Sequence, residues 1–252
     1  MFGNGEPVII LHGVFGMLDN WQIFAKKLAD EFWVSTIDLR NHGRSPHSDI
    51  FNYEVMISDV IEFLNNNHIK QPHIIGHSMG GKLAMHLALE HPEYINKLVI
   101  VDIGIKKYIS RHDEIFKALC SLNLKSYQKR EEIDRDLKKT ISNWNIRQFL
   151  MKNINRNKDK EGFKWKMNLN IIKDNYETII QKITSDFTFE GDTIFIKGEN
   201  SDFILEKDKP EILDLFPNAK FETIPNAGHW VHAEQTDKLI KITKDFLKLD
   251  LH

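Results

Sequence analysis

The stretch 74-IIGHSMGGKLA-84 decides the fold. It opens with the end of an apolar, β-branched run, continues with a serine between two glycines, and passes directly into residues that favour a helix. A strand that turns this sharply into a helix forces Ser78 into a strained backbone conformation, and side chains at Gly76 and Gly80 would collide with neighbouring elements. A serine that only caps a helix needs no such glycines. The pattern therefore predicts a nucleophile exposed above a sheet at a helix N-terminus.

Six short apolar runs alternate with helical patterns along the chain. They are PVIIL (7–11), WVSTI (33–37), HIIG (73–76), LVIVD (98–102), TIFIK (193–197) and KFETI (220–224). Such runs, separated by helices, indicate an α/β fold with a mostly parallel sheet covered by helices on both faces. Two stripes with helical spacing are assigned to core faces: Trp21, Phe24, Ala25 and Leu28, and then Leu239, Ile242, Phe246 and Leu249.

Residues 105–185 break this alternation, because the segment is long, rich in Lys and Asn, and has no convincing strand. We expect a helical cap inserted between two strands of a core formed by residues 1–104 and 186–252. The segment carries 19 Lys and Arg against 10 Asp and Glu, whereas the remainder carries 15 against 26. This basic surface could attract substrates that bear phosphate or carboxylate groups, or it could simply be a solvated lysine-rich face.

The composition narrows the class of protein. A chain of 252 residues can bury a full core without a disulfide or a metal, and its single cysteine, Cys120, excludes an intrachain disulfide. No apolar segment approaches the length of a signal peptide or membrane span, so we expect a cytoplasmic protein that does not enter the membrane. No nucleic-acid reader motif is present, so we expect no nucleic-acid partner.

A serine nucleophile needs a histidine base within hydrogen-bond reach and an acid that orients the base. His229 is the preferred base, since it follows a late strand in the small-residue loop of IPNAGHWVHAE. His232, three residues further on, is the local alternative. His77 lies next to the serine and is expected to pack or hydrogen-bond structurally, and His12 to maintain loop geometry.

Two aspartates are candidates for the acid. Asp102 ends the strand that follows the nucleophile, so its carboxylate should emerge at the same edge of the sheet. Asp202 follows the next strand, which is the commoner location, but its offset counts against it: in the usual G-x-x-D form the acid position after Gly198 is Ser201. Either carboxylate could instead cap a loop.

An oxyanion hole needs two backbone N–H groups aimed at the attacked carbonyl oxygen. Met79, directly after the serine, should supply one. The second should come from the loop LHGVFG, where Gly13 and Gly16 permit a tight turn. Val14 is the first choice and Phe15 the alternative.

Several motifs together carry a resemblance to a known family: LHGVFGMLDNW, DLRNHGRS, GHSMGGKLAM, VDI, RHDEIF and AGHWVHAE. In this order, from about residue 7 to 248, they resemble the α/β-hydrolase superfamily and, within it, the YbfF-like bacterial esterases. The resemblance implies that Asp102 is the acid, that the substrates are acyl esters of short to medium chain or acyl-CoA thioesters, and that no metal or organic cofactor takes part. Two features depart from the group. First, only six residues precede PVIIL, where an N-terminal hairpin is usual, so edge strands could be missing. Second, Asp202 stands where the group usually lacks an acid.

Five aromatic residues are candidates for an apolar acyl pocket between cap and sheet, although each could equally belong to the core. They are Phe15, Trp21, Trp144, Phe149 and Trp230.

The leading hypothesis is a serine esterase or thioesterase that acts on a small-molecule acyl ester or thioester, as a monomer or homodimer. The first alternative keeps the fold and changes the chemistry, to a C–C bond hydrolase or a menaquinone-pathway-type lyase. The second is a non-catalytic ligand receptor on the same scaffold. The serine, acid and histidine in the expected order argue against the receptor, whereas a C–C bond hydrolase or lyase would use the same residues.

Overall fold

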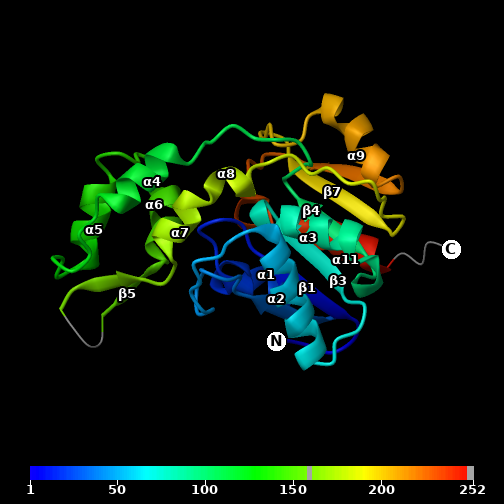
Figure 1. Ribbon diagram of the computed structural model, residues 1–252, viewed down its shortest axis with the longest axis horizontal. Coiled ribbons are helices and arrows are strands. Elements are labelled where there is room, and N and C mark those ends of the chain that lie inside the picture. The colour runs from blue at the N-terminus through cyan, green and yellow to red at the C-terminus, as the bar shows by residue number, and fades with distance from the viewer. Residues whose placement is uncertain (158–160, 249–252) are drawn as a thin grey trace.

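A computed structural model describes residues 1–157 and 161–248 (Figure 1). Within these residues, six strands form one parallel sheet in the order β2-β1-β3-β4-β7-β8. Each lies within one residue of a predicted apolar run, so the predicted α/β fold is confirmed. The strands are β1 (Pro7–Leu11), β2 (Trp33–Ile37), β3 (His73–His77), β4 (Leu98–Val101), β7 (Thr193–Gly198) and β8 (Ala219–Ile224).

Both faces of the sheet are buried at its central strands, which explains why β1, β3, β4 and most of β7 are buried. Successive side chains of a strand point to opposite faces. Val8 and Ile10 accordingly join a core cluster with α1 and α11, whereas Ile9 and Leu11 join a second cluster with α2, α3 and α9. The bounds of these helices are α1 (Gln22–Leu28), α2 (Tyr53–Asn66), α3 (Met79–Glu90), α9 (Lys209–Leu215) and α11 (Thr236–Lys248).

The two predicted apolar stripes lie on core faces. Phe24, Ala25 and Leu28 are buried on α1, and Trp21 is buried at the end of the short 3-10 helix η1 (Leu18–Trp21). On α11, Leu239 and Phe246 are buried and Ile242 packs partly buried beside them, while Leu249 lies outside the described residues.

Residues 105–185, which we call the insert, leave the sheet after β4 and return at β7, and Figure 1 shows them in green to yellow beside the sheet. The expectation of no strand here is wrong, since β5 and β6 pair antiparallel. Strands of three residues are too short to leave an alternating pattern in the sequence. Within this hairpin the Arg156 guanidinium covers the Phe163 ring, 5.2 Å from its centre. The division into core and cap stays a prediction. The insert contains α4 (Asp113–Cys120), α5 (Arg130–Leu137), α6 (Trp144–Met151), β5 (Ile154–Arg156), β6 (Phe163–Trp165), α7 (Leu169–Asp174) and α8 (Tyr176–Ile179), and the remaining short elements of the chain are η2 (Pro92–Tyr94), η3 (Glu206–Asp208) and α10 (Val231–Glu234).

A buried lysine ties both ends of the insert to helix α3. The Lys82 ammonium donates to the carbonyl oxygens of Ile105, Lys106 and Gln181. Burial lowers the pKa of this amine to about 7, because an ammonium loses its hydration there. Since Lys82 lies one helical turn after Ser78, the helix that begins at the serine also holds the two segments that lead into and out of the insert.

Candidate active site

Ser78 occupies a strained turn between β3 and α3. Its φ of 53° lies in the left-handed region that side-chain-bearing residues rarely adopt. A Cβ at Gly76 would lie 2.3 Å from the Gly80 carbonyl oxygen, and one at Gly80 would lie 2.4 Å from that of Leu11. Only glycine fits these positions, so the two glycines allow the turn that raises the serine side chain at the C-terminal edge of the sheet.

Asp102 follows β4 directly and is fully buried, with a φ of 50°. Its Oδ1 accepts from the backbone N–H of Gly198 at 2.9 Å, and its Oδ2 accepts from the Ser201 hydroxyl and from Nδ1 of His229, the latter at 2.8 Å. The Gly198 N–H, the Ser201 hydroxyl and the His229 ring together satisfy this buried carboxyl group. The arrangement fixes the carboxyl group beside His229.

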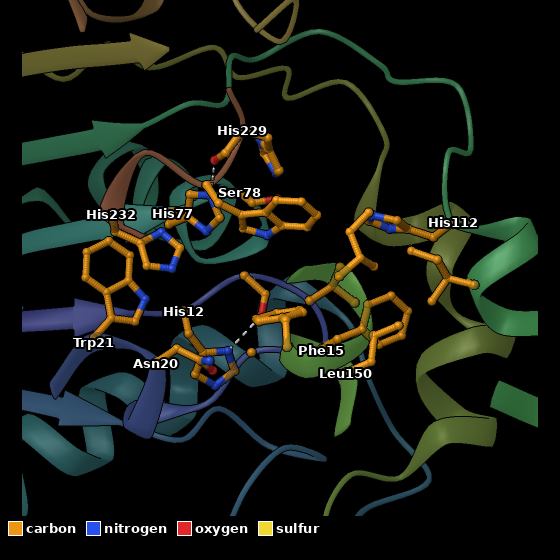
Figure 2. A pocket seen from close by; sticks show the side chains of 17 residues that line it. His12, Phe15, Asn20, Trp21, His77, Ser78, His112, Leu150, His229 and His232 are labelled. Carbon is orange, nitrogen blue, oxygen red and sulfur yellow. Dashed lines mark hydrogen bonds between the residues drawn. The ribbon is translucent and has the colours of Figure 1, made fainter. Parts of the chain in front are cut away.

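His229 lies in the loop between β8 and α10 and is held from three sides. Nδ1 contacts Asp102, and the His77 Nε2–H donates to the backbone oxygen of His229 at 2.9 Å (Figure 2). The Phe203 ring stacks on the imidazole with a centroid distance of 3.9 Å and an angle of 14°. With Nδ1–H donating to the carboxylate, Nε2 is the nitrogen free to accept a proton, and His229 lines the same cavity as Ser78.

The alternative acid, Asp202, has a different partner. Its two carboxylate oxygens accept from the Arg111 guanidinium at 2.6 and 2.8 Å, and 60% of its side chain is exposed. Arg111 lowers the pKa of this carboxyl. Ser201, at the usual acid position of the G-x-x-D pattern, instead supports Asp102. In the sequence, Ser201 was noted only because it stands where the usual pattern has an acid. That same offset of three residues from Gly198 was the signal that its side chain lies near the histidine.

The loop after β1 presents two candidate oxyanion donors. Gly16 N–H donates to the Gly13 carbonyl at 2.9 Å, and Phe15 has a φ of 60° with its own carbonyl bound by the buried Asn153 amide at 2.7 Å. Within the described chain, the N–H groups of Val14 and Phe15 donate to no other residue. Met79 is the first residue of α3, where a backbone N–H has no partner within the helix. These amides are available to a ligand beside Ser78.

His12 fixes the geometry of this loop, as expected. Its Nδ1–H donates to the Gly13 carbonyl at 2.8 Å and its Nε2 accepts from the Leu39 N–H at 3.0 Å. Burial lowers the pKa of His12 to about 4, so the ring is neutral and can play both roles at once. His232 is buried under Trp21, on which it stacks at 4.4 Å, and it has no contact with Asp102.

Two narrow cavities flank Ser78, each with a volume of about 30 Å³. The first is drawn in Figure 2, and its walls are largely apolar. Of the five predicted pocket residues, Phe15, Trp21, Phe149 and Trp230 line it. The prediction for Trp144 is wrong: it begins α6, is 61% exposed and lines neither cavity. Ile146, two residues further along α6, faces the cavity instead.

In residues 1–157 and 161–248, no three His, Cys, Asp or Glu side chains gather in an arrangement able to hold a metal ion. No helix of that same part is both long and apolar enough to span a bilayer.

Comparisons with known proteins agree with this geometry. Residues 6–236 match the family described as alpha/beta hydrolase fold. The chain is 37% identical to the sn-1-specific diacylglycerol lipase ABHD11 of Danio rerio, over 98% of this chain and 80% of the relative, and 34% identical to the esterase YbfF of Escherichia coli (strain K12), over 97% and 94%. A solved structure described as a marine microorganism esterase superposes with a TM-score of 0.95 at 43% identity, covering 97% of both chains. The fold, the serine turn and these similarities together show that the chain belongs to the α/β-hydrolase family and resembles its YbfF-like esterases.

Proposed function

We propose that the protein is a serine hydrolase that cleaves carboxylic esters or acyl thioesters of short to medium chain. Ser78 is the nucleophile, His229 the general base and Asp102 the acid that orients it. The observation that carries the proposal is the 2.8 Å contact between His229 Nδ1 and a fully buried Asp102, on a histidine that shares its cavity with the strained serine.

The first half-reaction forms an acyl-enzyme. Ser78 Oγ attacks the acyl carbonyl carbon while His229 Nε2 takes the hydroxyl proton, and Asp102 stabilises the resulting imidazolium. The bond from the carbonyl carbon to the leaving oxygen or sulfur then breaks, and His229 returns the proton to the leaving group. A water molecule releases the acyl group by the same route, and Ser78 recovers its proton.

Negative charge develops on the carbonyl oxygen at each tetrahedral intermediate. We assign its stabilisation to the backbone N–H of Met79 and that of Val14, with Phe15 as the alternative on the same loop. Each donor of this kind contributes about 3 kcal/mol. Both donors are backbone N–H groups, so a side-chain substitution at these positions affects them only by changing the geometry of the loop.

The shape and charge of the site support the substrate class. Phe15, Phe149 and Trp230 give the first cavity an apolar wall suited to an acyl chain. The relatives described as esterase and diacylglycerol lipase support ester cleavage, and the basic insert is compatible with an anionic acyl thioester.

A fluorophosphonate probe tests the reaction class. We expect the wild-type protein to gain one phosphonyl group, the probe less fluoride, on the peptide that contains Ser78. We also expect it to hydrolyse p-nitrophenyl acetate and butyrate faster than the palmitate. Heat-unfolded protein is the control for nonspecific labelling. The absence of both labelling and ester hydrolysis would contradict the proposal, and cleavage of a diketone substrate without ester hydrolysis would favour a C–C hydrolase.

Ser201→Ala should lower kcat by about tenfold, which corresponds to one lost hydrogen bond to a charged group. The Asp102 carboxylate would keep the Gly198 N–H and lose the Ser201 hydroxyl, so it would orient His229 less firmly. The measurement is kcat for p-nitrophenyl butyrate, together with the melting temperature. Ser58→Ala, an exposed serine of α2, is the control. An unchanged kcat would show that the Ser201 hydroxyl does not help to position His229.

A further inference from the structure

The two cavities beside Ser78 meet at a residue of the insert. Of the described residues, Val14, Ser78 and His112 line both cavities. The first two belong to the oxyanion loop and the nucleophile turn, whereas His112 immediately precedes α4. In Figure 2, His112 stands on the side of the cavity opposite Trp21 and His232. The insert thus places one polar ring at the junction where the scissile bond of a substrate would lie.

Contacts from separate parts of the chain fix this ring. His112 Nδ1 lies 2.7 Å from the hydroxyl of Tyr176, the first residue of α8. The ring also meets Phe15 edge to face, with a centroid distance of 5.4 Å and an angle of 69°. Because one nitrogen is held by Tyr176 and one face by Phe15, the imidazole has a defined orientation.

The second nitrogen of His112 is available. Nε2 makes no hydrogen bond to any residue in the described parts of the chain. Burial, together with the smaller effect of the nearby His229, lowers the pKa of His112 to about 4, so the ring is neutral at pH 7. Burial also keeps the Tyr176 hydroxyl protonated by raising its pKa. A neutral imidazole offers one donor and one acceptor, which leaves one hydrogen-bonding nitrogen for a ligand.

The leaving group is the part of the substrate that this nitrogen can reach. The leaving oxygen must lie near His229, from which it receives its proton, and His112 lines the same cavity as His229. Ile103, Ile109 and Ile179 are among the apolar residues of the second cavity. Its other polar side chains are already engaged: Lys82 donates to three backbone carbonyls, the Tyr108 hydroxyl to the Phe203 carbonyl, and Arg111 to Asp202. A polar atom on the leaving group would find its partner at His112.

We propose that His112 determines specificity by hydrogen-bonding, through Nε2, to an oxygen carried by the leaving group one or two carbons from the scissile ester. The favoured substrates are then esters of hydroxylated alcohols rather than of plain alkyl alcohols. This inference rests on the proposed ester hydrolysis and adds the identity of the alcohol. A site built to bind a hydroxyl discriminates against an analogue that lacks it, because the buried partner is left unpaired.

The test compares two esters that differ at a single group, 2-hydroxyethyl butyrate and propyl butyrate, with butyrate release followed by titration. We expect wild type to have the higher kcat/KM for the hydroxyethyl ester by about tenfold, the worth of one good hydrogen bond. His112→Phe keeps a ring in place and removes both nitrogens, so it should abolish the preference by slowing the hydroxyethyl ester alone. His112→Gln should restore part of the preference, and Tyr176→Phe should reduce it, because the ring loses its anchor.

Trp144→Phe, an exposed position on the same insert, is the matched control and should leave the ratio unchanged. An equal loss on both esters in His112→Phe would show that His112 supports the fold of the site, and an unchanged ratio would show that it does not contact the leaving group. Either result overturns the inference while leaving ester hydrolysis intact. If wild type hydrolyses neither p-nitrophenyl butyrate nor either of the two test esters, the proposed function falls together with the inference.

Discussion

Ser78→Ala is expected to lower kcat for p-nitrophenyl butyrate by about 10⁶-fold, the loss seen when the nucleophile of a serine hydrolase is removed. The variant retains the oxyanion donors and the substrate cavity but has no oxygen that can form the acyl-enzyme. It should also lose all fluorophosphonate labelling. The measurement is the burst and steady-state release of p-nitrophenol, with protein fold followed by circular dichroism.

The fold of this variant should survive. The left-handed backbone at residue 78 is imposed by the packing of Gly76 and Gly80, and alanine tolerates that conformation about as well as serine does. Ser58→Ala on α2 should match wild type in both activity and melting temperature. A Ser78→Ala protein that is folded and retains its full rate would show that the reaction uses another nucleophile.

The sequence alone predicted those parts of the site that depend on local backbone geometry. The turn at Ser78 was predictable because glycines at 76 and 80 are required wherever a strand turns sharply into a helix around a larger residue. The central strands were predictable because both of their faces are buried, which makes their apolar runs nearly continuous.

Features that depend on tertiary contacts were not predictable in this way. The sequence gives the spacing of Ser201 and Phe203 but not the fact that one binds the Asp102 carboxylate and the other stacks on His229. For Trp144, residue type favoured burial, yet its place at the first position of α6 turns the ring outward. The hairpin of the insert was missed because strands of three residues leave no periodic signal.

The position of His229 depends both on the local sequence and on tertiary contacts. Its loop could be assigned from the order of motifs, but its orientation results from three contacts made by Asp102, His77 and Phe203. Two of these partners follow strands at the same edge of the sheet, and the third lies beside the nucleophile. The imidazole is therefore positioned by the edge of the sheet, and its carboxyl partner in this structure, Asp102, directly follows β4.

This arrangement leads to a strong prediction for the acid. Asp102→Asn should lower kcat by about 10⁴-fold, as expected when a histidine is held in the wrong tautomer. The asparagine oxygen can accept from the Gly198 N–H or the Ser201 hydroxyl, but an amide nitrogen facing His229 would donate to Nδ1 and move the ring proton to Nε2. Nε2 could then no longer accept the serine proton. The measurement is kcat for p-nitrophenyl butyrate, together with the melting temperature.

Asp202→Asn is the matched comparison, since it makes the same chemical change on the neighbouring loop. It breaks an exposed ion pair with Arg111, and such pairs contribute about 1 kcal/mol or less. Its kcat should therefore stay within about fivefold of wild type. A severe loss in Asp202→Asn with a mild one in Asp102→Asn would mean that the loop rearranges when substrate binds and brings Asp202 to the histidine. The opposite result would support Asp102 as the acid and Asp202 as an anchor that ties Arg111 of the insert to the loop after β7.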